Sequence, residues 1–217
     1  MQVFDLSSKN SVLHQYMKEL RSTQIQGDSM RFRCNIKRIA HLMSYEISQH
    51  LNYQVEDVTT PLGIAPIPIA TDSLVLGTIL RAGLPFHQGF LDMFDHAENA
   101  FVSAYRKYTD AVNFDIHIEY IASPDLNGKT LILSDPMLAT GGSMELAYRA
   151  LLTKGKPAHT HLVAIIASRQ AVEYIQTHIQ DDNVTLWIAA VDEELNDHSY
   201  IVPGLGDAGD LAFGEKL

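Results

Sequence analysis

The chain has 217 residues, of which 46% are hydrophobic and 19% are charged, a composition that is typical of globular proteins and argues against disorder. Its formal net charge of -10 argues against a sequence-independent nucleic-acid binder, because such proteins need a basic surface. The single cysteine excludes an intramolecular disulfide framework.

The amino-terminal sequence and the most apolar stretch both bear on location. The opening MQVFDLSSKN has no basic region followed by an apolar core, so no signal peptide is predicted. The most apolar stretch covers residues 62–80, but Pro66, Pro68 and Asp72 interrupt it and exclude a membrane span. We therefore expect a cytoplasmic protein.

Two helices are predicted in the first fifty residues, at 8–21 and 29–50. In the second, Ile36, Ile39 and Met43 recur at three- and four-residue steps, which is helical spacing. Four cations cluster near its start: Arg31, Arg33, Lys37 and Arg38. A solvated helix face or a subunit contact explains this basic cluster more simply than RNA binding does.

From residue 74 onward, short apolar runs alternate with helical segments. The predicted strands cover residues 74–80, 100–105, 114–121, 130–135, 160–168 and 184–191. The predicted helices cover residues 84–94, 142–154 and 169–180. Continuous apolar strands that alternate with helices indicate an α/β fold, with a mostly parallel twisted sheet flanked by helices on both faces.

One predicted strand differs from the others. Residues 114–121, FDIHIEYI, alternate apolar and polar side chains, which is typical of a strand with one exposed face in a β-hairpin. We interpret residues 100–130 as a flap region. The chain as a whole, residues 1–217, is predicted to be one domain with an N-terminal helical extension over residues 1–50.

The strand at 130–135 leads into a turn of small residues. In a parallel sheet, ligands bind at the carboxyl ends of strands, and anions bind at the N-termini of the helices that follow. Asp135 lies at that position and could accept hydrogen bonds from sugar hydroxyls, while residues 139–143, ATGGS, could bind a phosphate through backbone amides and hydroxyls. A helix cap by Thr140 or Ser143 explains the same residues without a ligand, and the two interpretations are evenly balanced here.

Two other phosphate motifs are excluded. The sequence has no G-x-x-x-x-G-K-[ST], so it is not a P-loop NTPase. A G-x-G-x-x-G occurs at residues 204–209, but the eight residues after it are too few for the helix and second strand of a dinucleotide-binding unit. These glycines need another explanation.

Two long motifs resemble those of a known family. DPMLATGGS, residues 135–143, resembles the phosphoribosyl diphosphate loop of the type I phosphoribosyltransferases, and Pro136 in place of a second acid is similar to the uracil branch of that family. NDHSYIVPGLGDAGDLAFG, residues 196–214, resembles the ending of the same branch. Three shorter motifs follow in family order, at residues 45–46, 79–84 and 105–106. The resemblance covers nearly the whole chain.

The resemblance implies a role for each matching position. Asp135 would hold the ribose hydroxyls, the turn at 139–143 would hold the 5-phosphate, and Arg81 and Arg106 would neutralise the diphosphate. The segment 192–217 would recognise the base. The implied substrate-binding residues are Arg81, Arg106, Asp135, Pro136, Met137, Leu138, Ala139, Thr140, Gly141, Gly142, Ser143, Ile201, Gly206, Asp207 and Ala208. Asp135, Arg106 and Asp207 would be the catalytic residues.

The reaction implied by the family is displacement at the anomeric carbon of phosphoribosyl diphosphate by N1 of uracil, which gives UMP and diphosphate. Mg²⁺ would bind mainly through the diphosphate oxygens and water, with few protein ligands, and no metal-binding residues are predicted. His159 and His161 enter a strand as H-x-H, which places both on one face, and we interpret them as a surface pair. Family membership would also imply a homodimer or a larger assembly.

The sequence departs from the family in the flap, and this keeps two rivals open. Lys107 and Tyr108 replace carboxylates of the usual motif, and Pro85 and His87 occupy unusual positions after ILRAG. One rival is a phosphoribosyltransferase that acts on another base. The other is a regulatory protein that senses nucleotides on this fold and binds RNA or a protein partner, for which only the basic cluster offers a surface.

Overall fold

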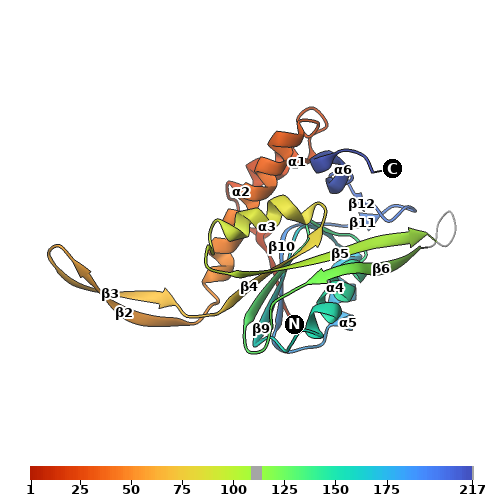
Figure 1. Cartoon of the computed structure of the whole chain (residues 1–217). Coiled ribbons are helices and arrows are strands. Elements are labelled where there is room, and N and C mark those ends of the chain that lie inside the picture. The colour runs from red at the N-terminus through yellow and green to blue at the C-terminus, as the bar shows by residue number, and fades with distance from the viewer. Residues whose placement is uncertain (109–113, 217) are drawn as a thin grey trace.

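The computed structural model describes residues 1–108 and 114–216, with side chains described outside residues 104–118 (Figure 1). The elements of the first half are β1 Gln2–Asp5, the 3-10 helix η1 Leu6–Ser8, α1 Leu13–Arg21, α2 Ser29–Ser48, β2 Tyr53–Thr60, β3 Gly63–Ala70, β4 Leu74–Leu80, α3 Gly83–Leu91 and β5 Glu98–Tyr108. Those of the second half are β6 Phe114–Ala122, β7 Thr130–Ser134, β8 Met137–Leu138, α4 Gly142–Leu152, β9 His159–Ser168, α5 Arg169–His178, β10 Val184–Asp192, β11 Glu194–Leu195, β12 Ile201–Val202 and α6 Ala208–Phe213.

A central sheet organises the fold. Over the described residues its strand order is β1-β10-β9-β7-β4-β5-β6, and the short β8 pairs with β9. The pairs are parallel except for β5 and β6, which form an antiparallel hairpin. This arrangement confirms the predicted α/β fold, and β5–β6 confirms the hairpin predicted in the flap region.

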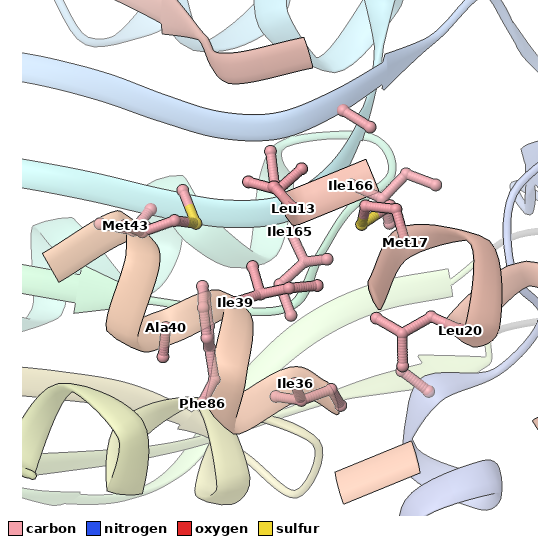
Figure 2. Close-up of a cluster of buried hydrophobic side chains, with 14 of the residues drawn as sticks. Leu13, Met17, Leu20, Ile36, Ile39, Ala40, Met43, Phe86, Ile165 and Ile166 are labelled. Carbon is pink, nitrogen blue, oxygen red and sulfur yellow. The ribbon is translucent and has the colours of Figure 1, made fainter. Parts of the chain in front are cut away.

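Both faces of the sheet are covered, as its apolar strands predicted. Because successive side chains of a strand point to opposite faces, Val163 and Ile165 of β9 pack toward α1, α2 and α3, whereas Leu162 and Ala164 pack toward α4 and α5. Figure 2 shows side chains of α1, α2 and α3 gathered around Ile165 and Ile166. The sheet therefore lies between two helical layers.

The predicted elements are present, with shifted ends. The six predicted strands and the helices between them lie within two or three residues of their expected bounds, but the helix predicted at 8–21 begins only at Leu13. The sequence did not predict β1, which pairs with β10 at the edge of the sheet. The N-terminal segment thus adds the strand Gln2–Asp5 to the central sheet and is not only a helical extension.

A second hairpin, β2–β3, was also not predicted. It extends far from the body of the molecule (Figure 1), and nearly all of its side chains are exposed. Pro66 and Pro68 lie in β3, and in a two-stranded hairpin their nitrogens can face away from β2, where no donor is needed. No helix among the described residues is both long and apolar enough to cross a bilayer.

Candidate active site

A cavity of about 760 Å³ lies at the carboxyl edge of the sheet, where β4 and β7 end. Most of its lining comes from three segments that are distant in the sequence: the end of β4 and the turn after it, the turn after β7, and residues 199–209. The predicted site residues that line it are Arg81, Asp135, Met137, Leu138, Ala139, Thr140, Gly141, Ser143, Ile201, Gly206, Asp207 and Ala208. The fold therefore brings the two long motifs to one place.

The remaining three predicted residues differ in their position. Pro136 is buried within the turn, and Gly142 begins α4. The side chain of Arg106, in β5, lies outside the described residues, so its role stays a prediction, as does the effect of Lys107 and Tyr108.

The cavity also has lining residues that sequence reasoning missed. Tyr200 belongs to the C-terminal motif, so the motif itself could have pointed to it. Lys216 adds a cation to the cavity wall, but it lies beyond the motif in a segment without pattern.

Asp135 follows directly after β7. Its backbone N–H donates to the carbonyl of Val163 at 3.0 Å, which continues the pairing of the sheet by one residue. Its Oδ1 accepts a hydrogen bond from the backbone N–H of Met137 at 3.1 Å, which holds the carboxylate in a local turn. The half-buried carboxylate is thus held at the cavity wall.

The turn after Asp135 ends at the N-terminus of α4. Gly141 is the N-cap residue, with a φ of 88°, and in the described structure no side chain makes a capping hydrogen bond there. The interpretation of Thr140 or Ser143 as a simple helix cap is therefore wrong. Thr140 and Ser143 face the cavity, and the positive end of the helix dipole favours an anion at this position.

Arg81 connects the two halves of the cavity. It follows β4, and its Nη2 donates to Oδ1 of Asp210 at 2.9 Å while Nη1 donates to the carbonyl of Gly214 at 3.3 Å. Both charged side chains are partly exposed, so the pair is a weak tie. A guanidinium at this position can also bind a diphosphate, which would compete with Asp210.

Asp207 has a structural task that the sequence did not predict. Its Oδ1 accepts hydrogen bonds from the amides of Gly209 and Asp210 at 2.8 and 3.0 Å, so it caps α6. Its Oδ2 faces Nζ of Lys216 at 3.3 Å. Burial alone would raise the pKa of Asp207, but the Asp210 amide and the Lys216 charge outweigh it and lower that pKa.

Residues of the N-terminal helical region hold the C-terminal loop in place by hydrogen bonds and an ion pair. Arg21 of α1 makes a bidentate ion pair with Asp192 at 2.7 and 2.8 Å, and Asp192 also accepts from the amide of Gly204 at 2.8 Å. Burial opposes the charge of Asp192, but Arg21 and this amide outweigh it and lower its pKa. Gln26 donates to the carbonyl of Leu205 at 3.1 Å, so several contacts fix the position of the loop.

Gly204 explains one of the glycines in the C-terminal motif. Its φ is 60°, and a Cβ atom there would lie 2.0 Å from the carbonyl oxygen of Ile201. Only glycine fits such a position. The loop can turn tightly toward the cavity because that residue has no side chain.

The basic cluster makes contacts within the protein. Arg31 pairs with Glu19 at 2.8 Å and Lys37 pairs with Asp92 at 2.7 Å. Arg33 donates to the carbonyl of Ala212 at 2.6 Å, and Arg38 donates to Asn35 at 3.0 Å. These contacts assign the cluster to helix packing and to the support of α6.

The prediction of a surface histidine pair is wrong. His159 and His161 do share a face of β9, with ring centroids 4.5 Å apart, but His161 is only 1% exposed. Its Nδ1 accepts from Trp187 Nε1 at 3.1 Å and lies 2.7 Å from Thr185 Oγ1. β9 is a central strand, and the rings of His159 and Trp187 lie beside the His161 side chain.

Comparison with known proteins identifies the family. The family model described as uracil phosphoribosyltransferase matches residues 7–215. The uracil phosphoribosyltransferase of Porphyromonas gingivalis is 62% identical over 217 residues and covers 100% of both chains, and that of Methanothermobacter thermautotrophicus is 39% identical over 94% of this chain and 93% of its own. The structure of the AQ2163 protein from Aquifex aeolicus has a TM-score of 0.87 at 29% identity and covers 98% of both chains. The chain therefore belongs to the uracil phosphoribosyltransferase family.

Proposed function

We propose that the chain transfers the phosphoribosyl group of phosphoribosyl diphosphate to N1 of uracil, which forms UMP and releases diphosphate in pyrimidine salvage. The observation that carries this proposal is that the phosphate-type turn at 139–143 and the loop at 201–208 line one cavity. The first suits a sugar phosphate and the second a small planar base. Family membership supports the same reaction.

The proposed mechanism relies on positioning and on charge stabilisation. The ribose hydroxyls would bind at Asp135, and the 5-phosphate would bind at the N-terminus of α4. The base would be held by the amides and carbonyls of the loop at 201–208, with N1 directed at the anomeric carbon. As the bond to diphosphate breaks, the negative charge that develops on the leaving group would be stabilised by Arg81 and Arg106.

We propose that Mg²⁺ accompanies the diphosphate. Among the described residues, no group of three or more His, Cys, Asp or Glu side chains could hold a metal ion. Asp135 with the hydroxyls of Thr140 and Ser143 offers a few oxygen donors, which fits an ion that keeps water and substrate phosphates as its main ligands. When bound, Mg²⁺ would neutralise charge on the leaving group.

A turnover assay tests the proposed function. Purified protein with Mg²⁺, phosphoribosyl diphosphate and uracil is expected to release diphosphate and to form UMP, measured by phosphate release after pyrophosphatase and by chromatography. Cytosine, hypoxanthine and adenine are the comparison bases. Turnover with one of these and none with uracil would contradict the substrate assignment and favour the rival with another base.

We further propose that the protein works as a homo-oligomer. The β2–β3 hairpin exposes apolar side chains that include Leu62 at 100%, Ile64 at 70% and Val55 at 68%. An isolated hairpin is marginally stable in water, so a second copy of the chain would stabilise it by covering these residues. Light scattering should give at least twice the chain mass, and I64K should lower it; a wild-type monomer would contradict the proposal.

A further inference from the structure

The turn proposed to bind the 5-phosphate is supported from behind by α5, a helix that does not reach the cavity. Ser168, the N-cap of α5, is fully buried. Its Oγ donates to the carbonyl of Ala139 at 2.6 Å and accepts from the amide of Ala171 at 2.9 Å. The first residue of the turn is thereby tied to the start of α5.

The second contact is steric. A Cβ atom at Gly141 would lie 2.6 Å from Cδ1 of Tyr174, so the tyrosine ring occupies the space on that side of the glycine. Gly141 also has a φ of 88°, which glycine adopts without strain, so its backbone can pack directly against the ring. Any displacement of the ring would allow the turn to shift.

The Tyr174 ring is itself held on two sides. Its Oη donates to Oε2 of Glu145 at 2.6 Å, and Glu145 belongs to α4, the helix that the turn begins. Its face stacks on His178 with ring centroids 3.8 Å apart and an interplanar angle of 17°. Glu145 also binds Arg149 at 2.8 Å. The turn, α4 and α5 thus form a closed set of contacts.

We propose that Tyr174 and Ser168 are positioning residues for the phosphate-binding turn, so that they set the affinity for the 5-phosphate without touching it. This inference rests on the proposed function. The physical reason is that amides and hydroxyls bind an anion well only when they converge on one point, and a misplacement of about 1 Å can cost up to about 100-fold. The base-binding loop has separate supports, so its affinity should not change.

The test compares UMP with uridine, which lacks the phosphate. Calorimetry on wild type should show tighter binding of UMP. In Tyr174→Ala the ratio of the two affinities should fall by about 10-fold to 100-fold, with little change for uridine. In turnover, the KM for phosphoribosyl diphosphate should rise while the KM for uracil stays within about twofold, a split that general destabilisation would not produce.

Tyr148 provides the matched control. It lies on α4, and its hydroxyl also binds a carboxylate, Asp181 at 3.0 Å, but it does not face the turn. Tyr174→Phe, which keeps the ring and loses the Glu145 bond, should lower the UMP-to-uridine ratio by about threefold, as expected for one lost hydrogen bond. Tyr148→Phe should leave the ratio unchanged. Ser168→Ala should act in the same direction as Tyr174→Phe.

A double variant tests the steric contact directly. Gly141→Ala alone should reduce UMP binding because the new methyl group meets the ring and the φ is strained. Adding Tyr174→Ala removes the clash between the new methyl group and the ring. The double variant should therefore bind UMP no more weakly than Gly141→Ala alone, so the effects of the two substitutions should not add.

The outcomes separate the inference from the function on which it rests. Wild-type protein without uracil turnover would overturn the proposed function, whatever the variants do. Wild-type turnover, with an unchanged UMP-to-uridine ratio in Tyr174→Phe and Ser168→Ala, would overturn only the positioning role. Additive losses in the double variant would overturn the steric contact. The positioning role is tested by Tyr174→Phe and Ser168→Ala, so that test does not depend on whether Tyr174→Ala folds well.

Discussion

Acid should destabilise this protein through one buried histidine. Burial lowers the pKa of His161 to about 3, from the ordinary histidine value of 6.5. The nearby His159 and His50 act in the same direction, while Asp72 opposes them. Trp187 donates to its Nδ1, so a second proton there would have to displace that hydrogen bond. His161 therefore stays neutral in the folded state, and the unfolded chain takes up the proton first.

The sign and size of the effect follow from proton linkage. Above pH 6.5 the residue is neutral in both states and contributes no pH dependence. Between pH 6.5 and about 3 only the unfolded state is protonated, so stability falls as the pH falls, by about 1.4 kcal/mol per pH unit. At pH 5.0 the loss from His161 amounts to about 2 kcal/mol relative to pH 7.5.

The assay is urea unfolding of wild type and of His161→Asn at pH 7.5, 6.5, 5.5 and 5.0, at one protein concentration. Asparagine keeps an oxygen acceptor near the position of Nδ1 and does not titrate. The variant will have a different absolute stability, but only the change with pH matters. The difference between the two proteins should shift by about 2 kcal/mol between pH 7.5 and 5.0. Parallel curves for the two proteins would refute the reasoning.

The remaining predictions concern the cavity and its supports. Asp135→Asn should raise the KM for phosphoribosyl diphosphate at least tenfold, which corresponds to about 1.4 kcal/mol. His159→Asn is the control and should leave this KM unchanged. Equal increases of the KM for the two variants in steady-state kinetics would mean that the site is misplaced. Asp192→Ala should lower the free energy of unfolding by about 3 kcal/mol, because it breaks a buried ion pair, and it should raise the KM for uracil; an unchanged urea midpoint would contradict this. Asp210→Asn should tighten diphosphate binding by about twofold to fivefold in calorimetry, since it frees Arg81 from a partly exposed pair, and weaker binding would contradict the competition.

Much of the fold could be predicted because its signals are local. Apolar runs such as 130–135 and 160–168 are buried on both faces, and the structure has strands at both places. The β2–β3 hairpin was missed for a physical reason, because Pro66 and Pro68 are tolerated only where a strand has a free edge. The burial of His161 was missed because strand alternation reports which side chains share a face and not what covers that face.

Some residues of the candidate site could be predicted from the sequence and others could not. Most of the predicted site residues that line the cavity lie in two continuous motifs, so the sequence could name them. Their supports could not be named, because Arg21, Ser168 and Tyr174 reach the site only through the topology of the fold. Asp207 shows a further limit: its predicted catalytic role stays a prediction, and the sequence did not reveal that its side chain also caps α6.

The two halves of the cavity are held by different layers of the molecule. The phosphate-type turn is supported by α5 on one face of the sheet, through Tyr174, and the C-terminal loop is supported by α1 on the other face, through Arg21. A substitution in one support should therefore weaken the binding of one substrate and leave the binding of the other unchanged. The Arg81–Asp210 ion pair joins the β4 turn to α6. A variant of this pair should therefore change the binding of both substrates together.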